Sequence, residues 1–268
     1  MKQLKIKKVN FGNMLEINKI YNQDCIEGMK LIDDKSIDMI CCDLPYGSTN
    51  CKWDVIIPFD QLWEQYKRII KDNGAIVLFG QEPFSSYLRI SNIDWYRYDL
   101  VWEKESATNF MQLKRRFGKT TEMISIFYKS QPTYNPQFYE HKGKPVYAKC
   151  SSKSKRFKSI TTSVNENLEL YEYVDNGLRY PKDVLRFNRV CNKHEILHPT
   201  QKPVELIEYL VKTFTNEGDL VLDNCMGSGT TAIACINTSR NFIGFETDEK
   251  YFNVAVNRII ENTQEKLF

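Results

Sequence analysis

The chain has 268 residues, of which 42% are hydrophobic and 26% are charged. These values leave enough apolar side chains for a sizeable core, in one large domain or in one domain with an insertion. No apolar run approaches the roughly 20 residues that a membrane-spanning helix needs. The Lys-rich start of the chain is not followed by the apolar stretch of a secretory signal. We therefore expect a cytoplasmic protein without a membrane partner.

The net charge of +3 hides an uneven distribution of charge along the chain. Residues 104–158 contain 13 Lys and Arg but only three acidic residues, a local balance of +10, so the rest of the chain carries −7. A basic segment on an acidic body suggests contact with nucleic acid. A solvated charged face is the alternative.

Cysteine usage indicates neither a disulfide framework nor a strong metal motif. Eight cysteines are present without any Cys-x-x-Cys pair, which predicts reduced thiols packed mostly in the core. The spacing of Cys191, His194 and His198 faintly resembles a metal cluster, but a second pair of cysteine ligands is missing. We therefore predict no metal.

Predicted strands and helices alternate in the first half of the chain, as in β-α-β units. In chain order they are a strand at 37–42, a helix at 59–70 that ends at Asn73–Gly74, a strand at 75–79, a helix from Pro83 to about Ile90, and strands at 96–102 and 123–128. This alternation predicts a mostly parallel sheet that is covered on both faces.

Residues 130–197 have a different composition, rich in Pro, Asn, Ser, Lys and Tyr and weak in apolar periodicity. Since 68 residues are many for a structureless loop, we predict an inserted recognition region, with a mobile surface loop as the alternative. The α/β pattern then resumes with a helix at 203–214, a strand at 219–223, a helix at 229–236, a strand at 241–245 and a helix at 248–260 capped by Thr247 or Asp248. One domain would therefore comprise residues 1–129 and 198–268.

A nucleoside cofactor is indicated by the segment from Leu220 to Thr231. An apolar strand there leads into Gly227-x-Gly229 and then into a helix. Glycines allow a ligand to approach the backbone, and a helix N-terminus offers free N–H groups. Glu246, at the end of the next strand, is placed to accept hydrogen bonds from ribose hydroxyls. A tight turn without a ligand is the alternative.

A reaction site is indicated by Asp43-Leu44-Pro45-Tyr46, directly after the predicted strand 37–42. Ligands in open α/β sheets bind at the carboxyl ends of the strands. The Asp43 carboxylate and the Leu44 carbonyl, held extended by Pro45, are acceptors for an amine, and Tyr46 offers a flat face. Together they suit a planar ring with an exocyclic NH2, although an ordinary turn remains the alternative.

These motifs resemble those of the amino-group DNA methyltransferases. Asp-Leu-Pro-Tyr is similar to the catalytic (D/N/S)-P-P-Y motif, and Asp223 to Thr231 resembles the S-adenosylmethionine motif D-P-F-x-G-S-G-T-T. The segment His198-Pro-Thr-Gln-Lys-Pro203 is identical to the one that precedes the cofactor motif in the β class, and the motif order is also that of the β class. The resemblance implies a Rossmann-like, S-adenosylmethionine-dependent methyltransferase fold with a mixed, mostly parallel sheet.

The resemblance also implies a role for each matching residue. Asp43 and the Leu44 carbonyl before Pro45 would hold the target amine, and Tyr46 would stack on a base swung out of the duplex. The residues implied to border S-adenosylmethionine are Asp24, Thr200, Lys202, Asp223, Gly227, Gly229, Thr230 and Glu246. The basic residues expected to contact DNA phosphates are Lys114, Arg115, Arg116, Lys119, Lys153, Lys155 and Arg156.

The chain departs from the family pattern twice, once in the catalytic motif and once in the cofactor motif. Leu44 replaces the usual first proline, which keeps the carbonyl but loses some rigidity. Asn224-Cys225 replaces Pro-Phe, which removes an aromatic wall from the cofactor pocket. Every polar group with an implied role is present, so we expect activity.

The function we predict is site-specific methylation of adenine N6 in DNA, since the first catalytic residue is Asp rather than Ser. Methylation of cytosine N4 is the nearest alternative, followed by a non-catalytic DNA-binding protein of the same fold and by methylation of glutamine in a protein. The expected partners are DNA, a cognate restriction endonuclease and a second copy of the chain.

Overall fold

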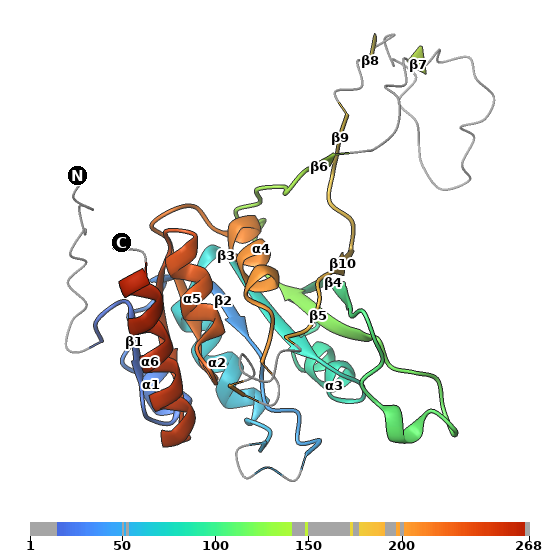
Figure 1. Ribbon diagram of the computed structural model, residues 1–268. Coiled ribbons are helices and arrows are strands. Elements are labelled where there is room, and N and C mark those ends of the chain that lie inside the picture. The colour runs from blue at the N-terminus through green and yellow to red at the C-terminus, as the bar shows by residue number, and fades with distance from the viewer. Residues whose placement is uncertain are drawn as a thin grey trace. The chain divides into compact units, whose positions relative to one another are not determined.

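The chain forms a mixed α/β unit and a smaller unit of short antiparallel strands (Figure 1). The computed structural model describes residues 15–49, 51, 54–140, 148–149, 172–173, 177–190, 197–198 and 201–265. The larger unit comprises Met1–Asn135 and Lys182–Phe268, and the smaller unit comprises Pro136–Pro181. Residues 182–190, at the end of the predicted recognition region, therefore belong to the larger unit.

In the described part of the chain, the main sheet contains eight strands in the order β1-β12-β11-β2-β3-β5-β4-β10. Their bounds are β1 Lys19–Tyr21, β2 Ile37–Cys42, β3 Ile70–Gly80, β4 Tyr96–Glu103, β5 Thr121–Phe127, β10 Val184–Arg186, β11 Leu220–Asp223 and β12 Asn241–Phe245. Neighbouring strands are parallel except where β5 pairs with β3 and β4. The ends of β2, β3, β4, β11 and β12 therefore share one edge with the start of β5; we call it the carboxyl edge.

Helices cover both faces of this sheet because its strands are apolar on both sides. Their bounds are α1 Cys25–Met29, α2 Phe59–Ile69, α3 Phe84–Ser91, α4 Val204–Phe214, α5 Thr230–Asn237 and α6 Glu249–Glu265. Buried residues of α1, α2 and α3 pack with Ile40 and Cys42 of β2 in one core cluster. Those of α4, α5 and α6 pack with Met39 and Cys41 in another, since successive strand residues point to opposite faces. The predicted α/β fold with a mixed, mostly parallel sheet is confirmed.

Two predicted boundaries were wrong or left open, and tertiary contacts decide both. The helix predicted at 59–70, with Asn73–Gly74 as its stop signal, ends at Ile69, because Ile70 takes an extended conformation and pairs with Ile37 of β2. The register is interrupted there, and the predicted strand 75–79 lies inside the longer β3. At α6, Asp248 is the capping residue, since its carboxylate accepts from the backbone N–H groups of Lys250 and Tyr251.

The smaller unit consists of antiparallel strand pairs in its described residues. β6 (Tyr139–Glu140) pairs with β9 (Leu178–Arg179), and β7 (Ala148–Lys149) pairs with β8 (Glu172–Tyr173). The rings of Phe138 and Tyr180 pack with centroids 4.7 Å apart.

The residues that flank the smaller unit on each side are fixed within the larger unit. The Asn135 N–H donates to the Thr213 carbonyl at 2.7 Å, and the Asn135 side chain donates to the Thr215 carbonyl at 3.0 Å. On the returning side, the Val101 N–H donates to the Asp183 carbonyl at 2.8 Å, where β10 joins β4. Both stems are therefore held by backbone groups at the end of α4 and along β4.

Candidate active site

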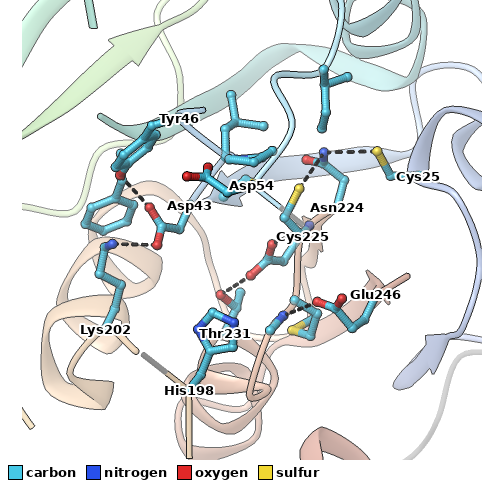
Figure 2. Close-up of a pocket in the computed structure, with 18 of the residues that line it drawn as sticks. Cys25, Asp43, Tyr46, Asp54, His198, Lys202, Asn224, Cys225, Thr231 and Glu246 are labelled. Carbon is cyan, nitrogen blue, oxygen red and sulfur yellow. Dashed lines mark hydrogen bonds and ion pairs between the residues drawn. The ribbon is translucent and has the colours of Figure 1, made fainter. Parts of the chain in front are cut away.

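One cavity of about 750 Å³ lies at the carboxyl edge and is lined by both sequence motifs (Figure 2). Its volume is within the range of small-molecule sites. The predicted residues that line it are Asp24, Asp43, Leu44, Pro45, Tyr46, Lys202, Asp223, Gly227, Thr230 and Glu246. The fold therefore brings together a catalytic motif and a cofactor motif that are about 180 residues apart in the sequence.

Asp43 lies directly after β2 and is held by two partners from different parts of the chain. The Lys202 ammonium donates to its Oδ2 at 2.5 Å, and the Tyr46 hydroxyl donates to its Oδ1 at 2.5 Å. Burial raises the pKa of Asp43, and the positive charge of Lys202 opposes that rise. A carboxylate has about four lone-pair sites, so both oxygens keep acceptor capacity for a further donor.

Glu122 completes this corner of the cavity, although no sequence motif pointed to it. It lies on β5, is 4% exposed, and contacts the ammonium groups of Lys104 at 2.7 Å and Lys202 at 2.9 Å. Burial alone would raise the pKa of Glu122, but Lys202 and Lys104 outweigh it and lower the pKa to about 2. Two carboxylates and two ammonium groups thus form a cluster without net charge, as buried charges require.

Tyr46 is half-buried at the wall of the cavity. Its hydroxyl lies 3.1 Å from Glu122 as well as against Asp43, and its ring packs on Phe84 with centroids 5.0 Å apart. Burial raises the pKa of Tyr46, so its hydroxyl is protonated at neutral pH and can donate. Its ring is therefore held at the cavity wall by contacts at both ends.

Asp54, which sequence reasoning missed, organises the loop that follows the catalytic motif. It is 7% exposed, and its carboxylate accepts from the backbone N–H groups of Gly47 at 2.8 Å, Ser48 at 2.9 Å and Thr49 at 2.6 Å. Burial would raise the pKa of Asp54, but hydrogen bonds from the Thr49 side chain and from these backbone groups lower it. The arrangement is an anionic anchor for a turn, and only a lone acid in a polar loop marked it in the sequence.

Buried hydrogen bonds fix the turn after β11. Asp223 accepts from the Thr231 hydroxyl at 2.6 Å and from the Cys225 N–H at 3.0 Å, and burial raises its pKa to about 6. Gly227 and Gly229 have positive φ of +54° and +81°, conformations that residues with a side chain rarely adopt. A Cβ at Gly229 would also lie 3.0 Å from the Ala255 Cβ on α6. The turn is therefore held in one conformation at the start of α5; we call the turn around Gly227 and Gly229 the cradle.

Glu246 faces this cradle from the end of β12. Its carboxylate oxygens accept from the backbone N–H groups of Gly227 at 2.7 Å and Asp248 at 2.8 Å, and burial raises its pKa. Each oxygen keeps a lone pair for another donor. An acceptor beside a glycine turn and a helix N-terminus fits the ribose and the charged end of a nucleoside cofactor.

The pair Asn224-Cys225, in place of the family's Pro-Phe, is part of a buried polar network. Asn224 is 2% exposed and accepts from the Tyr66 hydroxyl of α2 at 2.5 Å. Its amide group lies 3.6 Å from the sulfurs of Cys25 and Cys225. An aromatic side chain is still present at the cavity, since Phe245 lines it from β12.

Of the remaining predicted residues, Lys114, Arg115 and Arg116 are exposed. Asp24 lines the cavity while capping α1, because its carboxylate accepts from Ile26 N at 2.9 Å and Glu27 N at 3.1 Å. Lys119, predicted to contact phosphate, donates to the side chain of Gln81, which lines the cavity. The predicted residues outside the described part of the chain are Lys153, Lys155, Arg156, Thr200, Cys191 and His194.

Among the described residues, no group of three or more His, Cys, Asp and Glu side chains is arranged to hold a metal ion. His198 packs edge-on against Tyr251, with centroids 4.1 Å apart, and burial and then Lys202 lower its pKa to about 4. No helix within the described residues combines the length and the apolar character that crossing a membrane requires.

Comparison with known proteins decides the family. The N6/N4 DNA methylase family matches residues 37–257, which include the catalytic motif, the cofactor turn and Glu246. This chain belongs to that family. The sequence-based recognition and the predicted function class, transfer of a methyl group to an amino group of DNA, are therefore confirmed at the level of the family.

Individual relatives cover nearly the whole methylase chain. The type II methyltransferase M1.MboII of Moraxella bovis is 30% identical over 90% of this chain and 96% of its own length. The DNA adenine methyltransferase YhdJ of Escherichia coli K12 is 26% identical over 93% of this chain and 84% of its own. The crystal structure of the M1.HpyAVI–SAM complex superposes with a TM-score of 0.58 at 26% identity, over 90% of this chain and 98% of that one.

Proposed function

We propose that this methylase transfers the methyl group of S-adenosylmethionine to the exocyclic N6 of adenine in DNA. The observation that carries the proposal is the shared cavity, in which the Asp43 corner and the Gly227–Glu246 cradle lie together. An Asp at the first catalytic position and the similarity to a relative named as a DNA adenine methyltransferase support adenine over cytosine.

The catalytic corner would act on the target amine through its acceptors. The Asp43 carboxylate and the Leu44 carbonyl would accept the two amine hydrogens, which favours a more tetrahedral nitrogen with an available lone pair. S-adenosylmethionine, when bound at the cradle, would supply the methyl group. As the N–C bond forms and the S–C bond breaks, the nitrogen becomes positively charged and releases a proton, for which Asp43 is the nearby acceptor. Tyr46 would stack on the extruded base.

The other site residues would position these groups rather than react. Lys202 favours the ionised form of Asp43, and Glu122 with Lys104 holds Lys202 in place by buried ion pairs. Residues 130–197 would supply target recognition, and their basic residues would contact phosphates. A cognate restriction endonuclease, a homodimer and a cytoplasmic location stay predictions, of which the first agrees with the type II designation of M1.MboII.

The purified protein should methylate unmethylated bacteriophage DNA, and nucleoside mass spectrometry of the product should show N6-methyladenine. Sequencing that detects modified bases would then give the recognition site. If the product contains N4-methylcytosine and no N6-methyladenine, the target base is cytosine rather than adenine. No labelled methyl group in any DNA would favour a non-catalytic DNA-binding role.

A second expectation concerns Glu246, which we assign to ribose binding. Glu246→Ala should weaken S-adenosylmethionine binding by about tenfold to a hundredfold, since charge-assisted hydrogen bonds contribute roughly 1.5–3 kcal/mol. Isothermal titration would measure the change. Glu249→Ala, at the exposed start of α6, is the matched control and should bind like the wild type. Equal affinity of Glu246→Ala and the wild type would remove Glu246 from the cofactor site.

A further inference from the structure

The loop between β4 and β5, residues 104–120, combines a basic segment with exposed apolar side chains. Met111 is 99% exposed, Phe117 97% and Phe110 63%. Leu113, between them, is 46% exposed. Scattered single apolar residues on a surface are ordinary, but four large ones within eight residues form a cluster of the kind that marks a contact site. The catalytic mechanism above uses none of them.

The position of this β4–β5 loop ties it to the active site. It leaves the sheet at the end of β4 and returns at the start of β5, so it extends from the carboxyl edge (Figure 1). Lys104 and Thr108, at its base, line the active-site cavity. A partner bound at the cavity would therefore meet this loop.

Hydrogen bonds at its base give the loop a defined shape. The Asn109 side chain accepts from the Lys119 N–H at 2.7 Å and donates to the Phe117 carbonyl at 3.0 Å. The Thr108 N–H donates to the Lys119 carbonyl at 2.9 Å. The tip itself begins with the 3-10 turn η1 (Phe110–Gln112). The apolar side chains at the tip are thus displayed by a closed loop.

Charge identifies the class of partner. Lys114, Arg115 and Arg116 lie between Met111 and Phe117, and no Asp or Glu occurs from residue 106 to residue 121. Positive side chains suit a phosphate backbone, whereas apolar side chains without nearby charge would suit any apolar surface. Apolar side chains flanked by cations are the arrangement by which proteins insert wedges between base steps of a duplex.

We propose that Phe110, Met111 and Phe117 form a wedge that enters duplex DNA and occupies the gap left by the extruded target base, while Lys114, Arg115 and Arg116 bind the adjacent phosphates. The proposal rests on the DNA methylation proposed above. Extrusion loses the pairing and stacking of one base, and an inserted apolar side chain replaces part of that lost stacking. The wedge therefore acts before chemistry, on the equilibrium between the paired and the extruded base.

The test uses the double variant Met111→Ala/Phe117→Ala of the full chain. Both side chains are almost fully exposed, so we expect the thermal unfolding of the wild type. Single-turnover methylation is measured on a duplex with the mapped site and on the same duplex with an abasic position opposite the target. We expect the rate on the paired duplex to fall at least about tenfold, and the rate on the unpaired target to stay within about twofold. A fluorescent analogue of the target base should show correspondingly less extrusion.

Two control variants separate the wedge from other effects. Ile260→Ala removes an exposed apolar side chain from α6, which contacts β1 at the opposite end of the sheet, and should match the wild type on both duplexes. The triple variant Lys114→Ala/Arg115→Ala/Arg116→Ala should bind both duplexes more weakly, with a flatter salt dependence.

Three results would overturn the wedge. The first is a double variant that methylates the paired duplex at the wild-type rate, and the second is an equal loss of rate on both duplexes. The third is a change in the sedimentation of the double variant without DNA, which would assign the tip to a second copy of the chain. If the wild type methylates neither duplex, the proposed function itself has failed, which is a separate result.

Discussion

Asp43→Ala should reduce methyl transfer by at least about a thousandfold, because it removes the acceptor that would hold the target amine in the transition state. Loss of a single polar group that stabilises a transition state costs on the order of a hundredfold to a thousandfold, and Asp43 would also accept the released proton. Binding of S-adenosylmethionine should change little, since the hydrogen bonds that Glu246 makes with Gly227 and Asp248 do not involve Asp43. Radiolabelled methyl transfer and cofactor titration measure the two effects.

Two further variants give this prediction its controls. Asp43→Asn keeps the size and one acceptor oxygen, so its rate should lie between those of the wild type and Asp43→Ala. Asp94→Ala removes an exposed carboxylate outside the cavity and should leave the rate unchanged. Turnover by Asp43→Ala at a tenth of the wild-type rate or more would show that another group holds the amine.

Lys202→Met should both destabilise the fold and shift the pH dependence of the reaction. The variant leaves Asp43 and Glu122 near each other without the ammonium group that bridges them at 2.5 and 2.9 Å. Breaking a buried ion pair from one side costs about 3–5 kcal/mol of unfolding free energy. Urea unfolding at pH 7 would measure the loss.

The pH shift follows from the sign of the lost charge. The positive charge of Lys202 favours the ionised form of Asp43, so its removal raises the pKa of Asp43 further. The carboxylate is then formed only at higher pH, and the rate of Lys202→Met should keep rising with pH where that of the wild type is already constant. A pH–rate profile parallel to that of the wild type would place the effect of Lys202 elsewhere.

Glu122→Gln provides the test that the cluster acts as a unit. Combined with Lys202→Met it leaves one carboxylate and one ammonium group, Asp43 and Lys104, and so restores the charge balance. The double variant should therefore be more stable than the sum of the two single losses predicts, by about 1–3 kcal/mol. Strict additivity would show that the two groups are independent.

Local patterns made one half of the site predictable. The strand before Asp43 and the strand, glycine turn and helix around Gly227 are each encoded within a dozen residues. Their meeting in one cavity follows from the rule that parallel strands end at the same edge. The position of Glu246 after the next strand pointed to that residue as well, and the family resemblance then added the implied role of Asp24; both line that cavity.

The other half depends on contacts that no local pattern contains. Glu122 contacts Lys104 and Lys202 at the site only because β5 runs antiparallel between β3 and β4, so that its first residues return to the carboxyl edge. Lys202 was assigned to the cofactor from its motif, yet its ammonium contacts Asp43 and Glu122. The early end of α2 at Ile69 likewise depends on pairing with Ile37, which is distant in the sequence.

The two anchored stems of the insertion have a consequence for how such a chain can diversify. Asn135 and Asp183 are fixed to α4 and β4 by backbone hydrogen bonds, and the residues between them contribute no strand to the main sheet in the described part of the chain. Insertions and deletions are tolerated where they leave buried backbone hydrogen bonds intact. The segment between the stems can therefore be exchanged, lengthened or shortened without loss of the hydrogen bonds that hold its two ends. If recognition resides there, as we predict, target choice can evolve while the methyl-transfer apparatus stays constant.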